Sequence, residues 1–336
     1  MKKVLVVAPS WIGDTVLAQP LLALLARRDA LIDVIAPAWS APLLRRMPEV
    51  HAVIDNPLGH GDFNLAQRRA LGRQLAREHY DEAVVLPNSW KSALIPWFAG
   101  IPKRTGFTGE ARWGLLNNRH TLDKQALPQL VQRYAQLAQP TGSDAPPVLP
   151  STRLTSSPVQ QQATREALGL TVHGTPLAFC PGAEYGPAKR WPARHFATLA
   201  RTVATPSEPV WLIGAAKDKA VGDEIVGLSE GHAINLCGRT SLEQAIDLLA
   251  GARLVVSNDS GLMHVSAALG RPLVAVYGSS SPAYTPPLSS RAKIVSLQLS
   301  CSPCFKRECP LGHLNCLEQL DALHVVDAMK DMSHAA

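Results

Sequence analysis

The chain has 336 residues, of which 46% are hydrophobic and 18% are charged. These values are ordinary for a globular protein and exclude intrinsic disorder. The length predicts two domains, each large enough to bury its own core. Lys and Arg outnumber Asp and Glu by 33 to 27, a net charge of +6. This excess suits an anionic small molecule or a membrane surface, and it is too small for a dedicated nucleic-acid binder.

The N-terminal segment predicts a buried strand rather than a signal peptide. Its apolar run extends only from Val4 to Ala8, and Asp14 stands where the apolar region of a signal peptide would continue. No uncharged apolar stretch approaches the ~18 residues that span a bilayer. We therefore expect a soluble protein, or at most a peripheral one.

Short β-rich runs alternate with longer helical ones along the first half of the chain. One helix is expected over Thr15–Arg28, where Pro20 predicts a kink or a late start. A second helix is expected over Leu65–His79. The predicted strands are Lys3–Ala8, Leu31–Ala36, His51–Ile54 and Glu82–Leu86. This succession is typical of a doubly wound parallel sheet.

A Pro-rich linker is predicted over Thr141–Pro158, and the alternation restarts after it. The predicted strands are Pro176–Cys180, Val210–Ile213, Ile234–Leu236, Leu254–Ser257 and Pro272–Tyr277. The predicted helices are Ala193–Val203, Asp218–Leu228, Ser241–Ala250 and Leu262–Leu269, the third with Thr240 or Ser241 followed by Glu243 as its start signal. We therefore predict an α/β fold with two doubly wound domains facing each other across a cleft, residues 1–150 and 151–336. Ligands should bind at the carboxyl ends of the strands.

The first candidate functional segment, residues 10–15, is a glycine-containing turn directly after the first predicted strand. Its carboxylate, Asp14, could act as a general base at a helix start. Alternatively, Asp14 is a plain N-cap, which is the usual role of Asp at such a position and is favoured on spacing alone. The turn lacks the Gly-x-Gly-x-x-Gly pattern of dinucleotide-binding folds, which argues against a dehydrogenase.

The second segment, residues 180–192, joins a predicted strand to a predicted helix. Gly182 and Gly186 permit close backbone approach, and Lys189 and Arg190 are adjacent cations, a combination that suits a diphosphate. The segment is not a Walker A loop, because the Gly-Lys-Ser/Thr ending is missing. The alternative is a solvated loop with a tryptophan packed at the helix start, and the residue combination favours ligand binding over it.

The third segment, residues 255–264, leads a buried strand into Asn-Asp-Ser-Gly at the start of a helix. The N–H groups of that helix start should attract phosphate. His264 follows Ser260 by about one helical turn, so both can face the same site. The nucleophile elbow Gly-x-Ser-x-Gly is absent, which argues against a Ser-His-Asp hydrolase. The alternative makes Ser260 an N-cap and His264 an interior histidine, and we favour the phosphate site.

Four cysteines near the C-terminus, Cys301, Cys304, Cys309 and Cys316, follow the spacing C-x2-C-x4-C-x6-C. They could hold zinc or an iron–sulfur cluster. Alternatively they form a reduced or redox-sensitive surface loop. Structural zinc sites more often pair two knuckles at longer separation, so the spacing favours the loop, and we predict no metal.

Together these motifs resemble the ADP-heptose:lipopolysaccharide heptosyltransferases of glycosyltransferase family 9, the type II enzymes in particular. The resemblance covers nearly the whole chain, and its last two stretches are specific. It is carried by Pro-Ser-Trp-Ile-Gly-Asp14, Ala-Pro-Ala-Trp39, Pro48-Glu-Val50, Leu86-Pro-Asn-Ser-Trp-Lys91, Pro181-Gly-Ala-Glu-Tyr-Gly-Pro-Ala-Lys189-Arg-Trp-Pro192 and Asn258-Asp-Ser-Gly-Leu-Met-His264.

The resemblance implies a GT-B fold of two Rossmann-like domains, with the acceptor held by the first and the nucleotide sugar by the second. The last helix could pack back on the N-terminal domain. It also implies inverting transfer from ADP-L-glycero-β-D-manno-heptose to the first heptose of the Kdo2–lipid A core, in lipopolysaccharide biosynthesis. We expect a cytoplasmic protein, with peripheral contact at the inner membrane, no nucleic-acid partner, and a monomer favoured.

By the same resemblance, Asp14 is the base and Lys189 neutralises the diphosphate leaving group. The implied donor-binding residues are Gly182, Glu184, Lys189, Thr240, Asp259, Ser260, Gly261 and His264. Acceptor contacts are predicted for Asn88, Lys91, Lys103 and Arg104, with solvated surface cations as the alternative for the basic ones. No Asp-x-Asp metal motif is evident, so no cofactor should be required, although a divalent cation such as Mg²⁺ could act as an activator.

Three rival functions stay open on the sequence: a heptosyltransferase of type I or III, another GT-B enzyme such as a sugar-nucleotide epimerase, and a non-catalytic nucleotide-sugar binding module. The resemblance does not imply the cysteine segment for every member of the family. That departure concerns the C-terminal forty or so residues and leaves the cleft unaffected.

Overall fold

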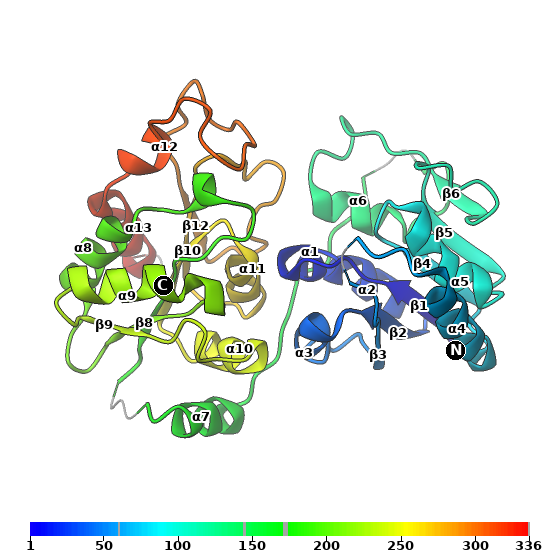
Figure 1. The fold of residues 1–336 in the computed structure, drawn as a ribbon, viewed down its shortest axis with the longest axis horizontal. Helices are drawn as coiled ribbons and strands as arrows, with labels where there is room; N and C mark the ends of the chain where they lie inside the picture. The colour runs from blue at the N-terminus through cyan, green and yellow to red at the C-terminus, as the bar shows by residue number, and fades with distance from the viewer. Residues whose placement is uncertain (60, 144–145, 171–173, 335–336) are drawn as a thin grey trace. The chain divides into compact units, whose positions relative to one another are not determined.

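The computed structural model describes residues 1–59, 61–143, 146–170 and 174–334. It divides into two compact units, Met1–Arg153 and Leu154–Ala336 (Figure 1). The division falls inside the predicted Pro-rich linker, close to the predicted boundary at residue 150. Residues 144–145 of that linker lie outside the described residues.

The N-terminal unit is built on a parallel sheet with the strand order β3-β2-β1-β4-β5-β6. Its strands are β1 (Lys2–Val7), β2 (Ala30–Ala36), β3 (Ala52–Asp55), β4 (Glu82–Val85), β5 (Lys103–Phe107) and β6 (Asn118–His120). Its helices are α1 (Ile12–Leu17), α2 (Gln19–Ala26), α3 (Ala41–Leu44), α4 (Leu65–Leu75), α5 (Leu94–Phe98) and α6 (Leu130–Gln136).

The helix expected over Thr15–Arg28 is interrupted, as Pro20 predicted. Helix α1 ends at Leu17, and α2 begins at Gln19 with Pro20 in its first turn. A proline ring is tolerated there because the N–H that it lacks would have no acceptor within the helix.

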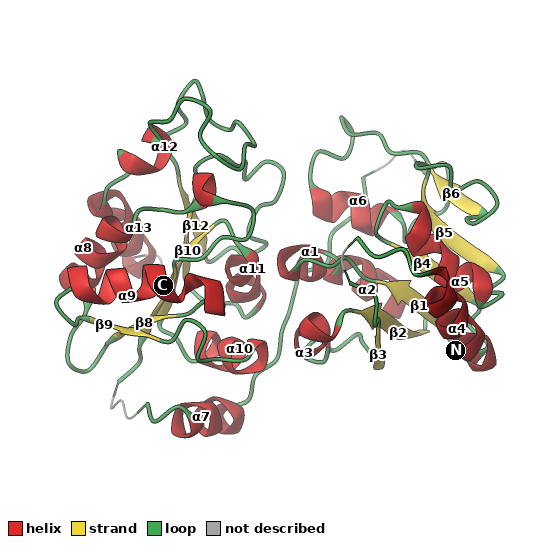
Figure 2. Cartoon of the chain, viewed as in Figure 1, coloured by secondary structure: helices red, strands yellow, loops and turns green. Residues whose placement is uncertain are grey.

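The C-terminal unit repeats this design with the order β12-β11-β10-β7-β8-β9, again parallel. Its strands are β7 (Leu177–Cys180), β8 (Val210–Leu212), β9 (Ala233–Asn235), β10 (Leu254–Asn258), β11 (Leu273–Val276) and β12 (Ala292–Val295). Its helices are α7 (Pro158–Ala167), α8 (Ala193–Val203), α9 (Lys219–Leu228), α10 (Leu242–Ala250), α11 (Gly261–Ala268), α12 (Asn315–Glu318) and α13 (Ala322–His334). Figure 2 shows helices on both sides of the strands of this unit.

The resemblance allows the final helix to pack on the N-terminal domain. In the structure this helix, α13, packs against α8, β11 and β12 of its own unit. Its apolar residues Val325 and Met329 belong to the C-terminal core. Within the described ranges, no helix is long and apolar enough to cross a membrane.

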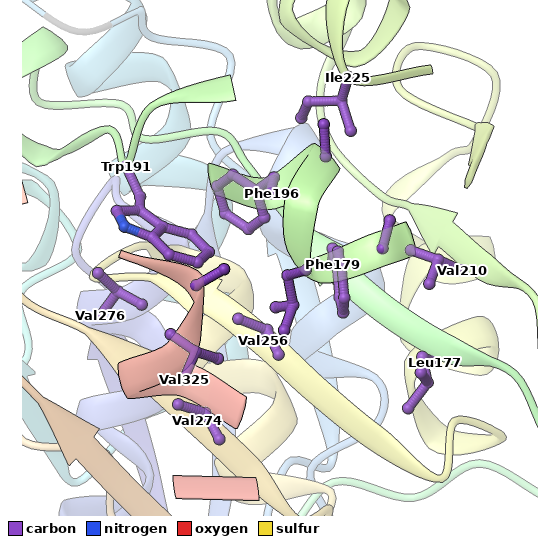
Figure 3. Packing of buried hydrophobic residues seen from close by; sticks show 14 of the residues in the cluster. Leu177, Phe179, Trp191, Phe196, Val210, Ile225, Val256, Val274, Val276 and Val325 are labelled. Carbon is purple, nitrogen blue, oxygen red and sulfur yellow. The ribbon is translucent and has the colours of Figure 1, made fainter. Parts of the chain in front are cut away.

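The C-terminal core lies on the face of the sheet that α8 and α13 cover. Alternate residues of β7, Leu177 and Phe179, belong to it, and Figure 3 shows Phe196 between Phe179 and Trp191. The Trp191 and Phe196 ring centroids are 4.8 Å apart in an edge-to-face arrangement, which aromatic pairs favour. Trp191, near the end of the loop 180–192, is therefore fixed in the core.

Each sheet reverses its winding direction between two central strands, β1 and β4 in the first unit and β7 and β10 in the second. In doubly wound sheets, ligands bind outside the carboxyl ends of the strands at this switch point. The loops that follow these four strands are the segments that the sequence singles out for chemistry.

Candidate functional site

Asp14 follows β1 at the switch point of the N-terminal unit, in the first turn of α1. The preceding turn is fixed by two bonds. The Trp39 indole N–H donates to the Ser10 carbonyl (3.1 Å), and the Thr15 hydroxyl donates to the Trp11 carbonyl (2.9 Å). Helix α1 begins at Ile12 with Trp11 as its N-cap, so the interpretation of Asp14 as the N-cap is wrong. The Asp14 side chain is half-buried.

Asn88 and Lys91 follow β4, the other switch-point strand of this unit. The Lys91 ammonium donates to the Gly61 carbonyl (2.8 Å), and the Asn88 amide oxygen accepts from the buried Arg112 guanidinium. Because both residues follow β4, they lie at the same carboxyl edge of the sheet as Asp14.

Lys103 and Arg104 lie at the opposite edge of the same sheet. They open β5, whose first residue pairs in register with Glu82 at the start of β4. The Lys103 ammonium pairs with the Glu82 carboxylate at 3.0 Å. Arg104 donates to the Leu115 and Ile101 carbonyls, each at 2.6 Å, and burial lowers its pKa. Their placement gives no support to the predicted acceptor contacts, because both side chains bond to groups within the N-terminal unit.

In the C-terminal unit, the loop from Pro181 to Pro192 is named the donor loop after its predicted role. It is held at both ends by Asn258, the last residue of β10. The Asn258 amide donates to the Pro181 carbonyl (2.7 Å), and its oxygen accepts the Trp191 backbone N–H (3.0 Å). The Asn258 side chain is fully buried. The sequence motifs gave Asn258 no separate role; the signal for it was a polar pair, Ser257-Asn258, at the end of an otherwise apolar strand.

Lys189, in a single 3₁₀ turn of the donor loop, meets Asp259 across the switch point. The ammonium and the carboxylate are 2.5 Å apart, and their side chains are 19% and 5% exposed. The Lys189 ammonium also lies 5.5 Å from the Tyr185 ring centroid, within the range of a cation–π contact. The Asp259 backbone N–H is taken by the Val276 carbonyl (3.1 Å). Asp259 therefore positions Lys189, which has further donors to offer a ligand.

Helix α11 begins beside this pair, with Ser260 as its N-cap. The Ser260 hydroxyl makes no capping bond and instead lies 3.2 Å from the Ser257 hydroxyl. The first-turn N–H groups of a helix have no acceptor within it, so an anion can take them here. The sequence alternative that makes Ser260 the N-cap is therefore right about its position, although its side chain makes no capping bond.

His264 is buried one turn further along α11. Burial lowers its pKa from 6.5 to about 4, although Asp259 opposes the shift. Its Nδ1 is among the buried atoms without a hydrogen-bond partner. His264 is thus a neutral imidazole at pH 7, able to donate or accept a hydrogen bond toward a ligand but unable to supply charge.

The remaining predicted donor residues lie in loops that follow β7 and β9 of the same sheet. Gly182 packs against the buried Asp218 carboxylate, and a Cβ at Gly182 would come within 2.2 Å of it. Glu184 is exposed and pairs with Lys217. Thr240 follows the edge strand β9, just before Ser241, which caps α10 with Gln244 rather than Glu243 as its partner.

Comparisons with known proteins identify the family. The family model for glycosyltransferase family 9 (heptosyltransferase) matches residues 68–315. Lipopolysaccharide heptosyltransferase 2 of Escherichia coli K12 is 49% identical over 88% of both chains. Lipooligosaccharide heptosyltransferase 2 of Haemophilus influenzae is 47% identical over the same shares. The solved structure of E. coli ADP-heptose LPS heptosyltransferase II is 43% identical over all of both chains, with a TM-score of 0.89. The chain belongs to glycosyltransferase family 9, the heptosyltransferases.

Proposed function

We propose that this chain transfers heptose from ADP-L-glycero-β-D-manno-heptose to the first heptose of the Kdo2–lipid A core, with inversion at the anomeric carbon. The observation that carries the proposal is the Lys189–Asp259 pair beside the start of α11, at the switch point of the C-terminal sheet. The high identity to relatives named heptosyltransferase 2 supports the sugar, the donor and the type II acceptor.

The C-terminal unit would bind the donor through its diphosphate. Lys189 supplies one ammonium, and the N-terminal N–H groups of α11, at Ser260 and Gly261, supply neutral donors. Charge grows on the diphosphate as the bond to the anomeric carbon breaks, so these groups act where charge develops. Neutral His264 would line the same pocket.

Asp14 would act as the general base. Its carboxylate takes the proton of the acceptor hydroxyl while that oxygen forms a bond to the anomeric carbon, and the bond from that carbon to the ADP oxygen breaks. Attack from the face opposite ADP inverts the configuration. A positioned general base of this kind contributes roughly 10²–10⁴-fold to the rate.

Asn88 and Lys91 are the acceptor-binding residues that we retain, because they share the carboxyl edge of the sheet with Asp14. We further propose that the enzyme needs no metal cofactor for the transfer, with Mg²⁺ at most an activator. It would work as a cytoplasmic monomer at the inner-membrane surface. The net charge of +6 and the exposed Trp39, Trp97 and Trp113 of the N-terminal unit suit such contact.

The test uses purified chain, ADP-heptose and core acceptors that carry zero, one or two heptoses, with product mass as the readout. We expect a gain of one heptose on the one-heptose acceptor alone. Transfer to the zero-heptose acceptor would instead indicate a type I enzyme. Release or inversion of the sugar without any acceptor would indicate an epimerase.

The Asp14→Asn variant tests the base. We expect kcat to fall by about 10²-fold or more while ADP binding is unchanged. Asp29→Asn is the matched control, because Asp29 is exposed, precedes β2 at the opposite edge of the sheet, and has a left-handed backbone (φ 58°) that Asn also tolerates. Full turnover by Asp14→Asn would refute the proposed base, and ADP-heptose binding without transfer to any acceptor would indicate a binding module.

A further inference from the structure

The four cysteines near the C-terminus surround one small cavity beside the donor loop. The cavity measures about 20 Å³, which is room for one water-sized particle. None of the thiols is in a disulfide, and the transfer reaction does not use them. The residues lining the cavity are Ala188, Ser279, Cys301, Cys304, Cys309, Pro310, Leu311, His313, Leu314 and Cys316. We call Cys301, Cys304, Cys309 and Cys316 the cysteine cluster.

The backbone around Cys309 is folded to favour a thiolate. A tight turn runs from Cys309 to Gly312, whose N–H donates to the Cys309 carbonyl (3.1 Å), and Gly312 has the left-handed φ of 73° that suits glycine. The Leu314 N–H then donates to the Cys309 sulfur at 3.4 Å. Hydrogen bonds to a sulfur favour its charged form and orient it as a metal ligand.

We propose that the cysteine cluster binds a single zinc or iron ion in tetrahedral thiolate coordination. Four sulfur ligands select these soft metals, and the size of the cavity fits one ion rather than a multi-iron cluster. On binding, each thiol releases its proton. The fifth candidate ligand, His313, is excluded because its Nδ1 accepts the Asn315 N–H (3.0 Å), which leaves the ring proton on Nε2.

The thiols must come closer together to complete the site. In the described part of the chain, no group of three or more His, Cys, Asp or Glu side chains is already arranged to hold an ion. Cys301, Cys304 and Cys309 are only half-buried, so their side chains are not fixed by the core. The ligand spacing alone favoured a metal-free loop. We base the proposal of a metal instead on the shared cavity and the bond to the Cys309 sulfur.

The ion would hold the segment between Cys304 and Cys309 against the donor loop. The Arg307 carbonyl accepts the Ala188 N–H (3.1 Å), and the Arg307 Nε donates to the Tyr185 carbonyl (2.8 Å). The Tyr185 hydroxyl donates to the Phe305 carbonyl (3.0 Å). A clamp at both ends of this short segment would therefore pre-organise the loop that carries Lys189. This positioning role rests on the proposed function, whereas metal binding does not.

The first experiment measures the metal in protein purified without chelators and under reducing conditions. We expect about one equivalent of zinc or iron per chain, with visible absorption only for iron. Cobalt added to the metal-free protein should give thiolate charge-transfer bands. The Cys304→Ser/Cys309→Ser double variant should lose both signals, while Cys237→Ala, which changes a buried cysteine outside the cluster, should keep them.

Less than about a tenth of an equivalent of metal, or disulfides within the cluster after reducing purification, would overturn the proposal. The second experiment measures ADP affinity with and without the ion, for which we expect about tenfold weaker binding of the metal-free protein. Bound metal with unchanged ADP affinity would refute the positioning role alone. Bound metal in a chain that transfers no heptose would refute the proposed function and leave the metal site standing.

Discussion

Replacing Asn258 with Ala should loosen the donor loop at both ends. The Asn258 side chain is fully buried and joins the Pro181 carbonyl to the Trp191 N–H. Its removal leaves a carbonyl and an N–H without their partners, at a cost of roughly 1–3 kcal/mol each. We expect the free energy of unfolding of the C-terminal unit to fall by about 3 kcal/mol, which lowers Tm by roughly 6–12 °C for a unit of this size.

Thermal unfolding followed by circular dichroism measures this loss, and calorimetric titration with ADP measures its effect on the site. Because Lys189 lies in the loop that Asn258 anchors, we expect ADP to bind at least about tenfold more weakly, which is ~1.4 kcal/mol. Asn235→Ala is the matched control. The Asn235 side chain also bonds backbone atoms, the Lys219 carbonyl (3.1 Å) and the Cys237 N–H (2.9 Å), but it lies on the edge strand β9.

The reasoning would be refuted if Asn258→Ala kept the Tm of the native chain, or if both variants weakened ADP binding equally. Asn258→Asp adds a second check. One of its oxygens can still accept the Trp191 N–H, but the other would face the Pro181 carbonyl as an acceptor against an acceptor. It should therefore be no more stable than Asn258→Ala.

Three further predictions follow from the same unit. Lys189→Ala should lower kcat about 10²–10³-fold, as loss of a transition-state charge donor does, with Lys189→Arg intermediate; a loss below about tenfold in steady-state assays would contradict the assigned role. Because burial lowers the pKa of His264 from 6.5 to about 4, the unfolded chain binds a proton in this range that the native chain does not. Stability should therefore fall by roughly 1 kcal/mol per pH unit from pH 6.5 to 4, and denaturant unfolding of His264→Gln should show a flatter dependence. Gly182→Ala places a Cβ 2.2 Å from the Asp218 carboxylate and should cost about 1–3 kcal/mol in unfolding experiments. Gly227→Ala, which meets nothing within 4 Å, should cost nothing.

The buried central strands could be predicted from the sequence because both faces of each sheet are covered. Strands in such sheets are continuous apolar runs, as in β1 and β10, and each predicted strand is present to within one residue at either end. The prediction missed β5, β6 and β12. These strands contain polar residues, as in Lys-Arg-Thr-Gly-Phe and Asn-Arg-His, and β12 lies half-exposed at a sheet edge. Their pairing partners, rather than a hydrophobic pattern, make them strands.

Charged residues were predicted less well than strands, because the partner of a charge is set by tertiary structure. Lys103 looks like a free cation in sequence, but the register of β4 and β5 brings Glu82 beside it. Asp259 directly follows a strand, a position typical of ligand-binding loops, but the structure pairs its carboxylate with Lys189. Asp14 illustrates the reverse case, since helix α1 starts two residues before it and removes its expected role as a cap.

The repeated strand order explains where each half of the proposed chemistry is found. In each unit the first strand, β1 or β7, is followed by the loop that carries the proposed reactive group, Asp14 or Lys189. The fourth strand, β4 or β10, brings the supporting polar residues to the same switch point. The proposed base must exchange a proton with an acceptor hydroxyl, whereas the proposed leaving-group cation gains strength beside a fixed carboxylate. Asp14 and Lys189 are both partly buried, and Lys189 lies beside the carboxylate of Asp259, on two copies of one topology. One fold therefore supplies two different environments through the loops that follow its first strand.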